Sequence, residues 1–143
     1  MLTQSEAEAL IAMEKSFSSP NAVVISPGVD ETYELNGADM RERFLLDLWR
    51  GMIRLSKLKV QTRGRSVVVL VRLDIDGAPH TNPDGKRLGG THLHLYREGY
   101  EDKWAYPLDR GQFRNTRVIT LTFLDFCRYC NVENIPPVQE ALI

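Results

Sequence analysis

Two segments in the middle of the chain alternate between kinds of side chain with a period of two, and this pattern confines both to β-strands. In residues 91–97, the polar side chains of His92, His94 and Tyr96 are separated by two leucines. Residues 66–76 have one uniformly apolar face, formed by Val67, Val69, Val71, Leu73 and Ile75. Their opposite face ends in Arg72, Asp74 and Asp76. Because successive side chains of a strand point to opposite faces, each segment predicts a strand with one buried face.

The rest of the chain predicts helices around a sheet. Apolar residues at helical spacing favour helices over residues 5–17 and 36–51, and a helix or a strand plus a helix over 117–130. Residues 22–35 predict a short hairpin, and residues 54–62 predict a strand. We therefore expect an α+β fold with an antiparallel sheet of about four to five strands and helices on one face, in a single domain that spans residues 1–143.

The composition is that of a soluble domain. Hydrophobic residues make up 43% of the chain and charged residues 26%, which is an ordinary globular balance. No apolar run approaches the ~20 residues of a membrane-spanning helix. The first residues lack the basic and apolar pattern of a signal peptide. We therefore expect a cytoplasmic protein with no membrane partner.

Charge is unevenly distributed along the sequence. Residues 1–40 contain seven acidic residues and one basic residue, whereas residues 41–65 contain eight basic and two acidic residues. A solvated helix face and a strand edge protected by lysines would account for the basic segment 41–65. The alternative is a partner that docks on this segment, either an anionic one such as RNA or a protein.

All three histidines, His80, His92 and His94, fall within residues 80–94. Imidazole ligates metals readily and changes its protonation near neutral pH, so this region is the candidate site. If residues 66–76 pair antiparallel with 91–97, Arg72 and Asp74 share the polar face with His92 and His94. Two such histidines could also be structural and hydrogen-bond to neighbours such as Asp74 or Glu98.

One function that fits these residues is acid–base cleavage of RNA without a cofactor. His92 and His94 would act as base and acid, because alternate residues of one strand lie ~7 Å apart, a separation that admits a phosphate. Further catalytic candidates are Tyr96, Arg72 and His80. Candidates for substrate binding are Asn82, Lys86, Arg87, Arg97, Lys103 and Trp104. In overall make-up the chain resembles small bacterial ribonuclease toxins.

The alternative chemistry is metal binding. His80, His92, His94 and Glu98 would hold a divalent transition metal such as zinc. Residues 92–98 resemble the first metal motif of cupins, in which an HxH pair is followed by a glutamate. No histidine follows His94, so His80 would have to complete a three-histidine site. The same alternation resembles the histidine-triad nucleotide hydrolases. In this chain Tyr96 stands where that family has its third histidine. The resemblance implies that His94 is the nucleophile.

Residues 76–108 also resemble a family of small uncharacterised bacterial and phage proteins. Three segments carry the resemblance: H-x-N-P-D-G from His80, G-x-H-x-H-x-Y-x-E-G from Gly90, and K-W-A-x-P-L from Lys103. The resemblance implies the position of the site but no reaction. A third hypothesis is therefore a non-enzymatic binding module of phage or mobile-element origin that docks through segment 41–65.

The two cysteines form a Cys-x-x-Cys pair, Cys127 and Cys130. They lie at the end of a helical pattern, where the N-terminal dipole that activates catalytic thiols is absent. We expect buried structural thiols. A zinc site that combines this pair with His92 and His94 is the alternative.

Overall fold

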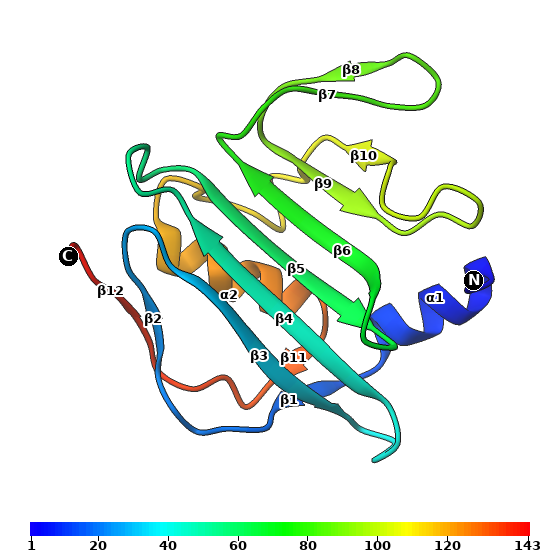
Figure 1. Cartoon of the computed structure of the whole chain (residues 1–143), viewed down its shortest axis with the longest axis horizontal. Coiled ribbons are helices and arrows are strands. Elements are labelled where there is room, and N and C mark those ends of the chain that lie inside the picture. The colour runs from blue at the N-terminus through cyan, green and yellow to red at the C-terminus, as the bar shows by residue number, and fades with distance from the viewer.

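Four long antiparallel strands form the centre of the fold. In the computed structural model, which describes residues 1–143, they are β3 (Asp30–Gly37), β4 (Arg43–Arg50), β5 (Leu58–Gly64) and β6 (Val68–Ile75). The sheet has eight strands (Figure 1), in the order β10-β9-β6-β5-β4-β3-β1-β11. The outer strands are β9 (His92–Leu95) and β10 (Ala105–Tyr106) on one side, and β1 (Lys15–Phe17) and β11 (Val132–Glu133) on the other. Within this sheet, only the β1–β11 pair is parallel.

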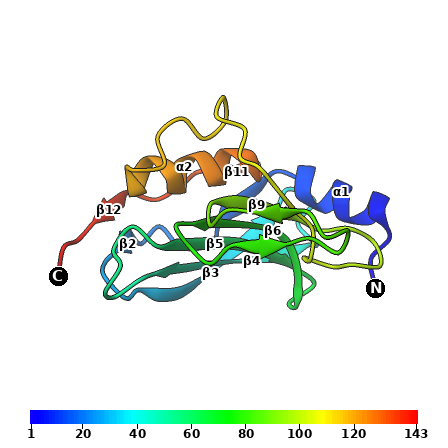
Figure 2. The same cartoon turned by 90° about the horizontal axis from the view of Figure 1, so that it is seen from above.

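Two helices cover one face of this sheet, and the other face is free of helices (Figure 2). The first, α1 (Gln4–Ala12), begins with a capping box between Thr3 and Glu6, and the second is α2 (Ile119–Tyr129). Two small strand pairs complete the structure: β2 (Val23–Ile25) with β12 (Val138–Glu140), and β7 (His80–Thr81) with β8 (Arg87–Leu88). The placement of helices on one face is confirmed, whereas four to five strands is too few. Neither helix is both long and apolar enough to cross a membrane.

The predicted helix over residues 36–51 is wrong, because this segment contains strand β4. Phe44 and Leu48 are four residues apart, so they fit a helical period and a strand period equally well. Phe44, Leu46 and Leu48 alternate and are almost completely buried, and β4 pairs along its length with β3 and β5. Pairing with two neighbouring strands, which no local pattern reports, decides between the two periods.

Two further boundaries differ from the prediction at the N-terminal end of the chain. The first helix ends at Ala12 instead of continuing to Phe17, and residues 15–17 form β1, which pairs with β3. The hairpin predicted over residues 22–35 does not form, because β2 pairs with the distant β12. Partners more than a hundred residues away in the chain therefore override the local turn signal.

A β-bulge at Leu70 interrupts the alternation predicted for residues 66–76. Thr62 pairs with Val71 and Arg63 pairs with Val69, so Leu70 is an extra residue in β6. The bulge lets both Leu70 and Val71 reach the core, and each is completely buried. Val67 lies before the bulge and is 77% exposed, which corrects its assignment to the buried face.

A buried lysine joins the C-terminal ends of the two helices. The Lys15 ammonium donates hydrogen bonds to the carbonyl oxygens of Ile11 (2.9 Å), Met13 (2.8 Å) and Cys130 (2.8 Å). Its three N–H donors are thereby all used, and the positive charge lies where helix dipoles favour it. Burial lowers the pKa of Lys15 to about 8, so the group is still charged at neutral pH.

We expect the substitution Lys15→Met to destabilise the protein by about 3 kcal/mol, because it leaves three carbonyl oxygens without their donor. Chemical denaturation at pH 7 measures this loss, and exposed Lys59→Met is the control.

Between pH 8 and the unfolded pKa of ~10.4, the unfolded wild type binds more protons at Lys15 than the folded state. The free energy of unfolding of the wild type should therefore exceed that of Lys15→Met by more at pH 9.5 than at pH 7. An equal difference at the two pH values would contradict this expectation.

Candidate functional site

Strands β6 and β9 bring the predicted site residues together on the face of the sheet away from the helices. Arg72 lies opposite His94, and Asp74 lies opposite His92, in the antiparallel pairing of these strands. The predicted pairing of residues 66–76 with 91–97 is thereby confirmed. Between the two histidines, Leu93 belongs to the hydrophobic core. Both imidazoles therefore project from the opposite face, next to the carboxylate of Asp74.

The hairpin β7–β8 and residues 97–104 cover the two imidazoles. The His80 ring lies over them, with its centroid 4.7 Å from that of His94 and 5.6 Å from that of His92. His80 is held through Nε2, which lies 2.9 Å from the Lys103 carbonyl oxygen. As a result, His92 and His94 are each only 1% exposed. The site is a closed polar cluster and not an open cleft.

Asn82 attaches the hairpin to β10. Its side-chain amide donates to the Ala105 carbonyl (2.9 Å), and its side-chain oxygen accepts from the Ala105 N–H (2.8 Å). The amide thus replaces the backbone of a neighbouring strand at the edge of the sheet. Because Asn82 is 6% exposed, both hydrogen bonds are shielded from water.

Backbone carbonyls fix the orientation of both imidazoles. Nδ1 of His92 lies 2.7 Å from the Gly89 carbonyl oxygen, and Nδ1 of His94 lies 2.7 Å from the Asp102 carbonyl oxygen. A carbonyl only accepts hydrogen bonds, so each Nδ1 carries the proton. Each Nε2 then presents its lone pair when the ring is neutral. The two Nε2 atoms lie 3.2 Å (His92) and 3.7 Å (His94) from Oδ2 of Asp74.

Arg72 lies beside this cluster and contacts two carboxylates and one imidazole. It donates through Nε to Oδ1 of Asp74 (3.1 Å) and through Nη1 to Oδ2 of Asp102 (3.0 Å). Its Nη2 lies 2.8 Å from Nε2 of His94 and donates to that lone pair. The Arg72 side chain is 26% exposed, so it connects the buried cluster to solvent.

The environment keeps Asp74 charged and His92 neutral. Burial by itself raises the pKa of Asp74, but its contact with the His94 ring and the charge of Arg72 outweigh burial, so the net pKa lies below the usual value. Burial lowers the pKa of His92 and outweighs the Gly89 carbonyl and the Asp74 charge, which both act in the opposite direction. An ionised carboxylate therefore faces the lone pair of a neutral imidazole.

Two of the predicted site residues lie away from this cluster. The Tyr96 hydroxyl donates to the Leu2 carbonyl (2.6 Å), and its ring packs in the hydrophobic core. The Glu98 carboxylate accepts from the backbone N–H of Gln4 (2.7 Å) at the start of α1. These contacts show that Tyr96 and Glu98 have structural roles.

Apart from the buried Asn82, the predicted substrate-binding residues lie on the β7–β8 hairpin and in residues 97–104. Lys86 and Arg87 are exposed on the β7–β8 hairpin. The guanidinium of Arg97 stacks 4.2 Å from the centre of the Trp104 ring. Lys103 holds His80 through its backbone and not through its ammonium.

Asp74 and Asp102 complete the site, although neither was among the predicted site residues. Asp74 could have been included, because the pairing of the two alternating strands already placed it beside the histidines. Asp102 lies in a loop and makes its contact with His94 through a backbone carbonyl, for which the sequence contains no signal.

The cysteine pair is not part of the site. Cys127 lies on the buried face of α2 and Cys130 directly follows the helix, and both are part of the core. The sheet therefore separates them from His92 and His94. Burial raises the pKa of both thiols, that of Cys130 to about 12. They are structural thiols, as predicted, and the zinc site combining them with the histidines does not form.

Three atoms of the cluster could ligate one metal ion. One ligand atom each from Asp74, His92 and His94 lies within 4.8 Å of the others, and all three residues are buried. A family model described as "Family of unknown function (DUF6978)" matches residues 2–132, which include the whole cluster. No curated protein and no solved structure matches the chain.

We expect Asn82→Ala to open the cover over the two imidazoles. The substitution removes both hydrogen bonds to Ala105, and one such buried bond stabilises by about 1 kcal/mol or more. Modification of His92 and His94 by diethyl pyrocarbonate, followed by mass spectrometry, should become about tenfold faster or more. Exposed Thr81→Ala on the same hairpin is the control. Equal modification rates in wild type and Asn82→Ala would show that the amide does not hold the cover.

Proposed function

Because the chain belongs to DUF6978, a family of unknown function, we propose its function from the chemistry of the site: the protein binds one divalent transition metal ion through Asp74, His92 and His94. The ligand atoms would be Nε2 of each imidazole and a carboxylate oxygen of Asp74.

One observation carries this proposal, namely the convergence of the two Nε2 atoms on a single carboxylate oxygen. Metal-binding histidines commonly donate their other ring N–H to a carbonyl or carboxylate, which fixes the tautomer and the ring orientation. Both imidazoles here have that arrangement, with Gly89 and Asp102 as acceptors.

The electrostatics of the cluster also favour a cation at its centre. With Nδ1 protonated, a neutral His92 directs its lone pair at Oδ2 of Asp74 over 3.2 Å. Two such acceptors repel each other unless a positive charge lies between them. The Arg72 guanidinium faces Oδ1 of Asp74 and Nε2 of His94, and leaves this pair of atoms without a cation.

The ligand set indicates which metals would bind. Two imidazoles and one carboxylate suit zinc and the other late first-row ions, whereas calcium and magnesium prefer oxygen ligands alone. Three protein ligands leave at least one coordination position open, and His80 lies over the cluster on the side of the hairpin. A bound metal would act there as a Lewis acid that the hairpin shields from bulk water.

Metal binding requires one side chain to move. Arg72 occupies the Nε2 lone pair of His94 and would have to release it. Its hydrogen bond to Asp102 can retain the guanidinium at the rim of the site, because that contact does not involve the metal ligands. Asp102 would therefore keep the same contacts in the metal-free and the metal-bound protein: its carboxylate accepts from Arg72, and its backbone carbonyl accepts from Nδ1 of His94.

The RNA-cleavage hypothesis stays a prediction and has a structural requirement. A phosphodiester would need to reach His92 and His94, which are each 1% exposed, so the β7–β8 hairpin would have to move aside. A metal ion needs less rearrangement, because it is small enough to occupy a closed cluster once Arg72 releases His94. For this reason we favour metal binding over acid–base catalysis.

Docking of RNA or of a protein on segment 41–65 also stays a prediction. Arg50, Arg63 and Arg65 of this segment already form ion pairs within the chain. A partner would therefore depend on the other bases, among them Arg54, Lys57 and Lys59.

We expect elemental analysis to find about one zinc, iron, cobalt, nickel or manganese ion per chain after metal-replete purification. Zinc added to metal-free protein should raise the unfolding midpoint by about 5 °C or more, because a ligand that binds only the folded state stabilises it. His92→Ala, His94→Ala and Asp74→Ala should each lose the ion and the shift.

The matched control is Asp47→Asn, which alters a carboxylate on the same sheet face that is paired with Arg63 and lies outside the cluster. This variant should keep the metal. A folded wild-type protein that binds no metal, or an equal shift in Asp74→Ala, would contradict the proposal.

A further inference from the structure

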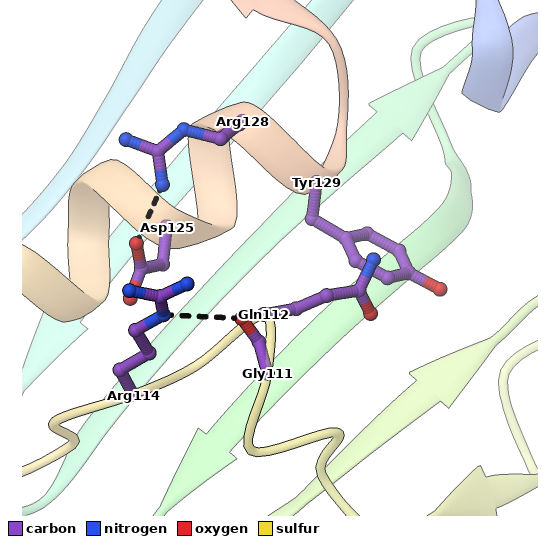
Figure 3. A pocket seen from close by; sticks show the side chains of 6 residues that line it. All are labelled: Gly111, Gln112, Arg114, Asp125, Arg128 and Tyr129. Carbon is purple, nitrogen blue, oxygen red and sulfur yellow. Dashed lines mark hydrogen bonds and ion pairs between the residues drawn. The ribbon is translucent and has the colours of Figure 1, made fainter.

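A second candidate site lies beside α2 on the other side of the sheet. A pocket of about 500 Å³ opens between this helix and the loop that follows β10 (Figure 3). It is lined by Gly111, Gln112, Arg114, Asp125, Arg128 and Tyr129. The metal site lies on the face away from the helices, so the two sites are independent.

One part of the pocket wall packs on the core. Phe113 is completely buried, and its ring lies 6.0 Å from that of Tyr129. Because Phe113 points inward, its neighbours Gln112 and Arg114 are left to line the pocket. The loop is also attached to α2, since the Thr122 hydroxyl donates to the Asn115 carbonyl (3.3 Å). The loop is therefore held against α2 without a ligand, whereas the side chains of Gln112, Arg114 and Arg128 are exposed to solvent.

The charges in the pocket do not balance. Two guanidinium groups, of Arg114 and Arg128, enter it with a single carboxylate, that of Asp125. Asp125 accepts from Nη1 of Arg128 (2.7 Å), whereas the hydrogen bond of Arg114 is a long contact of 3.5 Å from Nε to the Gly111 carbonyl. Arg114 has no ion-pair partner. Most of the guanidinium N–H donors therefore remain available to a ligand.

We propose that this pocket binds a small molecule carrying a phosphate monoester. Arginine recognises phosphate through paired N–H donors, and the two guanidinium groups come from different segments of the chain, so they can approach a tetrahedral oxyanion from two sides. The volume lies in the range of pockets that hold small organic ligands, which is larger than a bare anion requires. The Tyr129 ring and the Gln112 amide supply contacts for the rest of such a molecule.

Asp125 makes the proposal specific. Its carboxylate occupies one guanidinium in the free protein and would compete with an incoming phosphate. Removing the Asp125 charge should therefore strengthen binding, whereas removing either arginine should weaken it. A general attraction of anions to a basic surface would not distinguish Arg114 from other arginines of the loop.

Isothermal titration calorimetry of the full chain with adenosine monophosphate, inorganic phosphate and adenosine tests this inference. We expect saturable binding of adenosine monophosphate, weaker binding of phosphate and the weakest binding of adenosine. Arg114→Ala and Arg128→Ala should each weaken the binding of adenosine monophosphate about tenfold or more, because each removes charge-assisted hydrogen bonds. Asp125→Asn should strengthen it.

The matched control is Arg110→Ala, which removes the same charge from the same loop outside the pocket. Arg110 donates to the Thr116 hydroxyl and does not line the pocket, so affinity should change by less than about twofold. Arg114→Lys keeps the charge without the paired donors and should bind with intermediate affinity. Absence of saturable binding in folded wild-type protein, equal losses in Arg110→Ala and Arg114→Ala, or equal affinity for adenosine would each overturn the proposal.

Discussion

The pairing of β6 with β9 is the contact on which the site depends. Within this one strand pair, Asp74 faces His92 and Arg72 faces His94, so two imidazoles, a carboxylate and a guanidinium share one face. A slip of one residue would turn both histidines into the core and Leu93 out of it. The backbone N–H of Tyr96 donates to the carbonyl of Leu70, the bulge residue, and this hydrogen bond anchors the end of the pairing.

Much of this strand pair could be predicted from the sequence, because alternation of side chains is a local signal. The leucines beside His92 and His94 indicated which face is buried, and the matching pattern in residues 66–76 supplied the partner. Tyr96 shows where the signal ends. It continues the alternation, but β9 ends at Leu95, and the Tyr96 ring joins the core with its hydroxyl on Leu2.

The parts that could not be predicted depend on contacts between distant segments. Residues 43–50 fit two periods, and only the neighbouring strands decide between them. The extra residue at Leu70 leaves no mark in a run of valines and leucines. The cover over the histidines depends on Asn82 bonding to Ala105 and on His80 bonding to the Lys103 carbonyl. A turn motif predicts that the chain reverses there, but not what the turn packs against.

The buried ammonium of Lys15 has a consequence for how the chain is made. It bonds to α1 and to Cys130 at the end of α2, and β1 pairs with β11 beside it. A ribosome delivers these partners more than a hundred residues apart, so a growing chain carries Lys15 without its last acceptor and β1 without one neighbour until nearly all of this region has been synthesised. The central meander of consecutive strands has no such delay. Completion of the fold is therefore a late event of biosynthesis.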